Sequence, residues 1–403
     1  MIPLDLPKSD NLNIFFGLEK LEVFQAQPFD KLSIEFIAQL SKETLNNPTS
    51  KQFPDLVTFG YWCRKSNISK LRNNYDDLAN RLGLGLIFHV TPSNVPMNCA
   101  FSAIFSILSG NSNVIRVPSK GFKQVVLFLE SFKKIADSNK SFRPFLSRNI
   151  FVDYASQLDE FTNYFSKISD ARVIWGGDES IRKIRSFETK EKAPDIVFPD
   201  KVSGSVINLK EISLLSAKDF KRFINNLYND IYIMDQNACS SPTAIFFLNH
   251  DKASEDKIWK ELSELAKLKY DLSAHQVISK FTKASELAAQ GLLEDKLDHD
   301  DYFLYKADLD SIKEKDLSSL KQNSGFLFYK KITMIEDMLP YINDKFQTLT
   351  YFGLQRDDIL NFLNTSKPSG IDRFCPVGSA LEIGLVWDGY DLIRSLSRII
   401  QIS

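Results

Sequence analysis

The chain has 403 residues, of which 43% are apolar and 25% are charged, with 50 basic and 51 acidic side chains. One domain commonly takes about 150 residues, so this length predicts two or three domains. The formal net charge of −1 gives no overall attraction to nucleic acid or to an anionic membrane, and neither is expected as a partner.

The most apolar helical stretch, CAFSAIFSILSG (residues 99–110), has 12 residues, whereas a membrane span needs about 20. The first residues, MIPLDLPKSD, lack the basic flank and apolar core of a secretory signal. We therefore expect a cytoplasmic protein without a membrane span.

The first 80 residues are predicted to be mostly helical, because residues 30–47 and 67–82 have apolar side chains at helical spacing. From Gly83 onward, short apolar runs alternate about four times with amphipathic segments. The expected strands lie within residues 83–90, 111–119, 148–156 and 170–178, and the expected helices within 97–110, 120–139, 157–169 and 179–190. This alternation predicts a parallel sheet with helices on both faces. Ligands usually bind such sheets beyond the carboxyl ends of the strands.

A second alternation is expected after residue 205. The predicted helices cover residues 218–234 and 254–270, and the predicted strands lie within 243–248, 324–332 and 346–354. The tail VWDGYDLIRSLSRII (386–400) is predicted to form a turn and a helix.

The loop HVTPSNVPMN (89–98) joins an expected strand to an expected helix. Two prolines fix the backbone on either side of Asn94, and a rigid amide at a helix start would donate to a developing oxyanion. The alternative is that Ser93 or Asn94 only caps the helix.

The loop VIWGGDESIRKIR (173–185) places Gly176 and Gly177 between a strand and a helix. Glycines there allow a phosphate to approach the backbone closely. The loop lacks the full G-x-G-x-x-G pattern of dinucleotide sites, and Asp178 would serve equally as a helix N-cap.

A third loop, VIRVPSK (114–120), places Arg116 at a strand end, followed by Ser119 and Lys120. An arginine makes forked contacts to phosphate, so this trio suits a nucleotide ribose or its 2′-phosphate. The alternative is ordinary surface charge.

The four cysteines, Cys63, Cys99, Cys239 and Cys375, are scattered and form no CxxC pair or Cys/His cluster. Neither a disulfide framework nor a metal site is expected. Cys239 lies among small and polar residues in DQNACSSP, outside any apolar periodic run. An accessible thiol of this kind suits a nucleophile, and a packing role is the alternative.

The order and spacing of these motifs resemble the aldehyde dehydrogenase superfamily: Pro-x-Asn-x-Pro on a strand-to-helix loop, SGNSNVIRVPS, a strand followed by Gly-Gly and a helix, and Gln-x-x-Cys before a strand. Within it, WGGDESIRKIR, DQNACSSP and DRFCPVGSALEIGLVWDGYDLIRSLSR resemble the acyl-CoA reductase (LuxC-type) family. The resemblance runs from about residue 60 to the C-terminus.

The resemblance implies an α/β fold with two Rossmann-like parallel-sheet domains, for cofactor binding and catalysis, plus a small oligomerisation or bridging element. We expect residues 1–205 to form an N-terminal helical segment and the cofactor domain. Residues 206–370 would form the catalytic domain, and residues 371–403 would return to the cofactor domain or bridging region.

Carried over by resemblance, Cys239 matches the nucleophile of the family and Asn94 matches the oxyanion-binding amide. The other matches are to the site of a nicotinamide cofactor: Thr91, Arg116, Ser119, Gly176, Gly177 and Ile181. Arg116 stands where the superfamily usually has a ribose-contacting lysine. Ser119 stands where NAD-preferring members often have a glutamate, so the resemblance favours NADPH, with NADH as the second choice.

Two departures from the superfamily bear on the reaction. The segment DIVFPDKVSGSVIN (195–208) lacks the Glu-Leu-Gly-Gly motif that holds the glutamate base of hydrolytic members. Without a base to activate water, an acyl-enzyme would be released by a thiol, which favours CoA-linked reduction. SGFLFYKKI (324–332) stands in place of the Glu-x-Phe-Gly-Pro segment that normally contacts the nicotinamide ribose.

The resemblance therefore implies an acyl-CoA reductase that converts a long-chain fatty acyl-CoA to the aldehyde through an S-acyl group on Cys239, with CoA as leaving group. One alternative is a dehydrogenase that oxidises an aldehyde with NAD(P)+, and another is a non-catalytic subunit that binds acyl groups or a partner enzyme. By resemblance we expect a homo-oligomer, with an acyl-transferring or aldehyde-consuming enzyme as a further partner.

Overall fold

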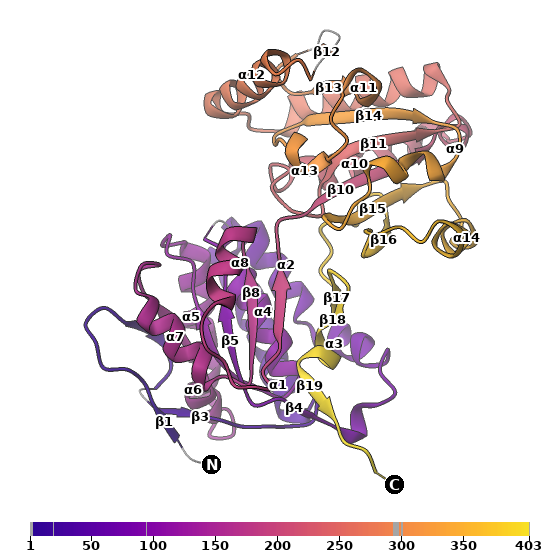
Figure 1. The fold of residues 1–403 in the computed structure, drawn as a ribbon. Helices are drawn as coiled ribbons and strands as arrows, with labels where there is room; N and C mark the ends of the chain where they lie inside the picture. Colours follow the sequence, from indigo (N-terminus) through magenta and orange to yellow (C-terminus); the bar gives the residue numbers. More distant parts are fainter. Residues whose placement is uncertain (1–2, 19, 94, 293–297, 300, 403) are drawn as a thin grey trace. The chain divides into compact units, whose positions relative to one another are not determined.

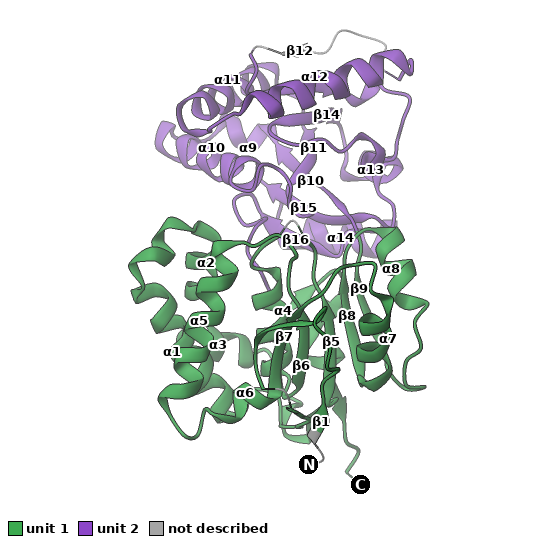
Figure 2. Cartoon of the chain, turned by 90° about the vertical axis from the view of Figure 1, so that its left-hand side faces the viewer, with its two compact units in different colours: residues 1–199, 385–403 green, residues 200–384 purple. Residues whose placement is uncertain are grey.

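The computed structural model describes residues 3–18, 20–93, 95–292, 298–299 and 301–402. The chain forms two compact units (Figures 1 and 2): unit 1 contains residues 1–199 and 385–403, and unit 2 contains residues 200–384. Each unit has its own largely parallel β-sheet. The expected α/β class with two parallel-sheet domains is therefore confirmed.

The sheet of unit 1 has the strand order β2-β7-β6-β5-β8-β9. Its strands are β2 (Asn13–Phe16), β5 (Leu86–Val90), β6 (Ser112–Arg116), β7 (Asn149–Asp153), β8 (Ala171–Trp175) and β9 (Asp195–Phe198). All neighbours are parallel except β2, which pairs antiparallel with β7 at one edge. Four of these strands were predicted, whereas β2 and β9 were not.

Helices cover both faces of this sheet (Figure 2). The helices of this unit before residue 200 are α1 (Lys31–Asn46), α2 (Pro54–Trp62), α3 (Lys65–Arg72), α4 (Asn98–Leu108), α5 (Lys123–Ser138), α6 (Pro144–Arg148), α7 (Asp159–Ile168) and α8 (Asp178–Arg185). On β7, Phe151 packs edge-on against Phe128 and Phe132 of α5. The alternate residue Val152 lies in the core cluster with Phe165 of α7. Side chains of β7 thus pack on both faces of the sheet, because successive residues of a strand point to opposite faces.

The sheet of unit 2 has the strand order β12-β13-β14-β11-β10-β15-β16. Its strands are β10 (Val202–Asn208), β11 (Pro242–Leu248), β12 (Asp298–His299), β13 (Tyr305–Asp308), β14 (Phe326–Ile332), β15 (Phe346–Phe352) and β16 (Arg373–Pro376). Only β12 is antiparallel to its neighbour. Because β10 pairs with β11 and β15 from Val202 onward, the residues just before position 205 belong to this sheet.

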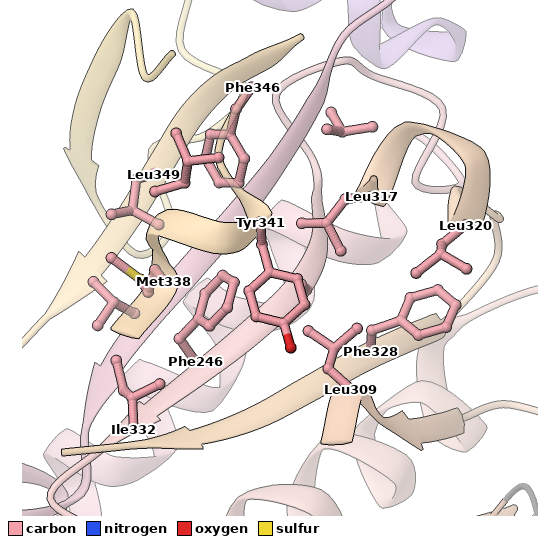
Figure 3. Close-up of a cluster of buried hydrophobic side chains, with 14 of the residues drawn as sticks. Phe246, Leu309, Leu317, Leu320, Phe328, Ile332, Met338, Tyr341, Phe346 and Leu349 are labelled. Atoms are coloured by element: carbon pink, nitrogen blue, oxygen red, sulfur yellow. The ribbon is translucent and has the colours of Figure 1, made fainter. Parts of the chain in front are cut away.

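The helices of unit 2 are α9 (Leu209–Ser213), α10 (Ala217–Tyr232), α11 (Lys252–Lys269), α12 (Ala274–Ala289), α13 (Leu317–Leu320) and α14 (Arg356–Ser366). On one face of β11, Phe247 packs in a cluster with residues of α10 and α11. On the other face, Phe246 joins the cluster of Phe328, Met338 and Tyr341 (Figure 3). Burial on both faces explains why the strand reads as one apolar run.

Both ends of the chain differ from the sequence prediction. The first 22 residues contain β1 (Pro3–Asp5) and β3 (Lys20–Glu22), which pair with each other, besides β2. Helix α3 ends at Arg72 instead of residue 82, where Asn73 and Asn74 favour a turn over a helix. No helix within the described part of the chain is long and apolar enough to cross a membrane.

The predicted C-terminal turn is present, but the predicted helix is much shorter than expected. The tail forms a hairpin of β17 (Val386–Trp387) and β18 (Tyr390–Asp391), a single turn α15 (Leu392–Ser395), and β19 (Ser397–Ile399). Strand β19 pairs antiparallel with β4 (Arg81–Gly83) of the same unit. This long-range pairing overrides the helical spacing of the tail.

Candidate active site

The loop that carries Cys239 connects the end of α10 to the start of β11. It therefore lies at the amino ends of the parallel strands of unit 2. The general rule pointed to the carboxyl ends, so Cys239 lies at the opposite edge of its sheet. Ser203 of β10, Phe326 of β14 and Thr348 of β15 belong to the same amino edge.

Exposure separates Cys239 from the other three cysteines. Cys239 is partly exposed, whereas Cys63, Cys99 and Cys375 are buried. Burial raises the pKa of the Cys99 thiol to about 12 and that of Cys375 to about 11, and it also raises the pKa of Cys63. These three thiols stay protonated at neutral pH and suit packing roles, because the thiolate is the reactive form. Of the four thiols, Cys239 is the one that is open to solvent.

Gln236 holds both ends of this loop, although the sequence assigned it no role. It has a left-handed backbone (φ +60°), and its side chain is 1% exposed. Its Nε2 donates to the carbonyl oxygens of Pro242 at 2.8 Å and Phe326 at 3.0 Å. Its Oε1 accepts from the backbone N–H of Gly325 at 3.0 Å. A buried amide with three well-formed bonds fixes the loop against β11 and β14.

Two more side chains tie the loop to its surroundings. The hydroxyl of Ser203 donates to the carbonyl oxygen of Cys239 at 2.6 Å, which fixes the backbone at the predicted nucleophile. Asn323 Nδ2 donates to Asn237 Oδ1 at 2.6 Å. The loop is therefore anchored on two sides by neutral polar groups.

One carboxylate belongs to the loop. Asp235, with φ +51°, accepts a 2.6 Å hydrogen bond at Oδ1 from the hydroxyl of Tyr270. Burial, together with this bond to Asp235, raises the pKa of Tyr270, so the phenol remains a donor. Asp235 is thus occupied by the Tyr270 hydroxyl. It also lies outside residues 195–208, the segment that corresponds to the general-base motif of the superfamily, so it does not correspond to that base.

The expected cofactor residues of unit 1 lie at the carboxyl edge of its sheet, as the sequence predicted. Thr91 directly follows β5, Arg116 ends β6, and Gly176 directly follows β8. In the register, Val90 is opposite both Arg116 and Ile174, which brings these three strand ends together. Thr91 is 8% exposed, and its hydroxyl donates to the carbonyl oxygen of Arg116 at 2.6 Å.

Arg116 is half-buried, unlike ordinary surface charge. Its guanidinium donates to the carbonyl oxygen of Tyr154 at 3.1 Å and lies over the Tyr154 ring, 4.6 Å from the centroid. Ser119 and Lys120 are exposed. The arginine is thus held at the strand end, and Ser119 is open to an approaching ligand.

Gly176 and Gly177 lead into α8 at the same edge. Gly177 is the N-cap and makes no side-chain cap, so Asp178 is the first helical residue and not the cap. A Cβ added to Gly176 would meet only the Cβ of Ser180, at 3.5 Å, so the backbone is open on that side. This uncapped helix start fits a phosphate group. Ile181 is 6% exposed and packs in the core of unit 1.

Asn94 lies outside the described residues. The helix that follows it, α4, begins at Asn98 with Met97 as N-cap and without a side-chain cap. Ser93 is therefore not the N-cap. No group of three or more His, Cys, Asp or Glu side chains within the described ranges is arranged to hold a metal ion.

A family model described as acyl-CoA reductase (LuxC) matches residues 64–399. Among solved structures, 1-pyrroline-5-carboxylate dehydrogenase from Thermus with bound NAD is similar with a TM-score of 0.61 at 11% identity, covering 91% of this chain and 80% of that chain. Lactaldehyde dehydrogenase from Escherichia coli has a TM-score of 0.60 at 10% identity, covering 91% and 85%.

Aldehyde dehydrogenase 21 from Physcomitrella patens, in complex with its reaction product succinate, has a TM-score of 0.59 at 9% identity, covering 91% of this chain and 84% of that chain. At these identities the likeness shows the fold alone, which is that of the aldehyde dehydrogenases. No curated protein sequence matches the chain.

Proposed function

Because the chain belongs to the acyl-CoA reductase (LuxC) family, we propose that it reduces a long-chain acyl-CoA to the aldehyde with Cys239 as the nucleophile. The family and the fold indicate an oxidoreductase that acts on acyl or aldehyde groups. The observation that supports the finer proposal is the state of Cys239. Of the four thiols it is the partly exposed one, and its loop is fixed by Gln236 and Ser203.

In the first half of the proposed reaction, the Cys239 thiolate adds to the carbonyl carbon of the thioester. The carbon–sulfur bond to CoA then breaks, the CoA thiolate leaves, and an S-acyl group remains on Cys239. We assign the stabilisation of the tetrahedral oxyanion to the Asn94 amide and the Cys239 backbone N–H. One such donor typically lowers the barrier by about 2.7–4 kcal/mol.

A bound nicotinamide cofactor would supply the hydride for the second half of the reaction. The residues of unit 1 that would hold it are Thr91, Arg116, Ser119, Gly176 and Gly177. Their arrangement fits a dinucleotide, since they combine an uncapped helix start with a fixed arginine at one sheet edge. The exposed Ser119 brings no negative charge against a 2′-phosphate, which supports NADPH. Cys239 acts in this half as the leaving thiolate when the aldehyde is released.

Reduction is favoured over hydrolysis of the acyl group by the side chains that fix the loop. Ser203, Asn323 and Gln236 are neutral, and none of them removes a proton from water at neutral pH. Asp235 already accepts the Tyr270 hydroxyl. An enzyme that oxidises aldehydes to free acids needs a base to activate water, and the sequence segment that would hold it has no glutamate.

The test is covalent labelling in the absence of reductant. Wild-type protein incubated with acyl-CoA labelled in the acyl chain should retain about one acyl group, and peptide mass mapping should find it on Cys239. Cys239→Ala should retain none. Cys375→Ala, which removes a buried thiol, should label like the wild type. Equal labelling of Cys239→Ala would exclude the proposed nucleophile.

The same preparation tests the finer assignments. Turnover with a series of acyl-CoA lengths and with NADPH or NADH gives the chain length and cofactor preference, which we expect to be long-chain and NADPH. CoA-independent reduction of NAD(P)+ by aldehyde would favour an oxidising dehydrogenase. Light scattering during size-exclusion chromatography tests the expected homo-oligomer.

A further inference from the structure

We propose that Lys280 is a positioning residue for the nucleophile, because it fixes the 323–325 turn to which the Cys239 loop is bonded. The inference rests on the proposed role of Cys239. The whole chain of contacts lies within unit 2.

Lys280 is buried where packing alone would accept an apolar residue. It is 1% exposed, and the only other buried residue of α12 is Leu287. A lysine is almost never fully buried unless its ammonium is paired. Here Nζ donates to the carbonyl oxygens of Tyr302 and Ser324, the latter at 2.8 Å. It also lies 5.0 Å from the centroid of the Tyr305 ring, in a cation–π contact.

The ammonium form persists at neutral pH despite this burial. Burial lowers the pKa of Lys280 to about 8, and the nearby Asp301 acts in the opposite direction. Asp301 itself is paired with Lys267, at 2.6 Å between Nζ and Oδ2. Lys280 therefore binds the carbonyl oxygens of Tyr302 and Ser324 directly. The positions of these two oxygens depend on the lysine side chain.

The turn that Lys280 holds has an unusual backbone. Ser324 has φ +61° and Gly325 has φ +83°, both in the left-handed region. A Cβ at Gly325 would overlap the Phe303 carbonyl oxygen, so only glycine fits. Ser324 also donates its N–H to the carbonyl oxygen of Asp235 at 3.0 Å. Lys280 thus binds the backbone C=O of Ser324 and Asp235 binds its N–H, which together hold this residue in its left-handed conformation.

This turn is bonded to the nucleophile loop at three consecutive residues. Besides the bond from Ser324, Asn323 Nδ2 donates to Asn237 Oδ1 and the Gly325 N–H donates to Gln236 Oε1. Gln236 in turn binds Pro242 on the other side of Cys239. A shift of the turn would therefore be passed to the thiol, and a misplacement of about 1 Å can lower a rate about 100-fold.

The experiment compares three variants of the full-length chain. Lys280→Met keeps the bulk of the stem and removes all donors, whereas Lys280→Gln keeps a donor without the charge. Lys283→Met is the matched control, since Lys283 on the same helix donates to the Ser319 carbonyl oxygen, outside the turn. The measurements are the acylation rate of Cys239, KM for the cofactor, and hydrogen exchange of residues 323–325.

We expect Lys280→Met to slow acylation at least 10-fold while KM for the cofactor stays within twofold. Exchange at residues 323–325 should accelerate at least 10-fold. Lys280→Gln should recover at least one third of the wild-type rate, and Lys283→Met should match the wild type in all three measurements. A purely structural loss would affect KM equally and would not be rescued by Gln.

Acylation of Lys280→Met within twofold of the wild type, or an equal loss in Lys283→Met, would overturn the proposal. If Lys280→Met does not fold, Gln236→Met interrupts the same chain of bonds at its other end and is judged by the same thresholds. If the wild type is not acylated at Cys239, the proposed function fails. The role of Lys280 is then decided by hydrogen exchange at residues 323–325 and by alkylation of Cys239 with iodoacetamide. In Lys280→Met the alkylation rate should change at least threefold.

Discussion

The carbonyl oxygen of Cys239 accepts a hydrogen bond from the hydroxyl of Ser203, with 2.6 Å between the two oxygens. The same hydroxyl oxygen accepts from the backbone N–H of Thr348 at 3.0 Å. Ser203 lies on β10 and Thr348 on β15. The backbone position of Cys239, the proposed nucleophile, is therefore fixed by two strands at the centre of the sheet as well as by its own loop.

Ser203→Ala should lower the acylation rate of Cys239 about 10-fold and the free energy of unfolding by about 1 kcal/mol, the usual contribution of one buried hydrogen bond. Ser205→Ala is the control, because the Ser205 hydroxyl is buried on the same strand without a hydrogen-bond partner within the described residues. It should leave both quantities unchanged. Pre-steady-state labelling and urea unfolding measure them, and equal losses in both variants would contradict the role of Ser203.

The strands that the sequence predicted are those with continuous apolar runs, such as β5 and β11, because each is buried on both faces. Strand β10 has an equally central place but was missed. Its sequence VSGSVIN contains small polar residues where the backbone packs closely: a Cβ on Gly204 would come within 2.9 Å of the Phe346 ring. These residues of β10 are small because large side chains of the neighbouring strands fill the space beside them. Such a strand has no apolar run, so hydrophobic patterning does not indicate it.

The nucleophilic role of Cys239 is a prediction from its local composition and from the family resemblance, whereas the groups that bind its loop were not predicted. Gln236 binds Phe326, which is 90 residues away, and Ser203 binds Cys239 across 36 residues. Spacing along the chain reports helix and strand faces, and it carries no signal for such pairs. The sequence did not indicate the role of Lys280 either, because its contacts are distant in sequence and an isolated lysine on an amphipathic helix is usually exposed.

His89 should make unit 1 sensitive to acid. Burial lowers its pKa from 6.5 to about 4, although the bond to Asn113 acts against this. Nε2 lies 2.9 Å from Asn113 Oδ1 and Nδ1 lies 2.7 Å from the Ser102 hydroxyl. Because Asn113 Nδ2 donates to Asn149, its Oδ1 faces the ring, so Nε2 donates and Nδ1 accepts. Protonation of Nδ1 would break the bond from Ser102.

The folded chain thus binds this proton only near pH 4, whereas the unfolded chain binds it near pH 6.5. Stability is therefore lost as the pH falls through that window. The wild type should lose about 3 kcal/mol more between pH 6.5 and pH 4 than His89→Gln. The exposed His275 provides the control, as His275→Gln should parallel the wild type. Urea unfolding at several pH values measures this, and parallel curves for His89→Gln would refute it.

Gly325→Ala should strongly destabilise unit 2. The added Cβ would approach the Tyr232 hydroxyl to 2.5 Å and overlap the Phe303 carbonyl oxygen, at φ +83°. Gly291→Ala is the control, because Gly291 also has a positive φ (+64°), but a Cβ added there would meet nothing within 4 Å. We expect a loss of about 1 kcal/mol from backbone strain at Gly291 and at least twice that at Gly325. Thermal unfolding measures both, and equal losses would show that the steric overlap is relieved.

Ser119→Glu should reverse the expected cofactor preference. Ser119 is exposed and lies three residues beyond Arg116, whose guanidinium is held on Tyr154. A carboxylate at this position would repel a 2′-phosphate and accept hydrogen bonds from the ribose hydroxyls of NADH. We expect KM for NADPH to rise at least 10-fold while KM for NADH changes by less than threefold. Ser119→Gln adds nearly the same bulk without charge and should leave the NADPH preference in place. If Ser119→Gln weakens NADPH as much as Ser119→Glu does, the side chain acts by its volume and the electrostatic explanation fails.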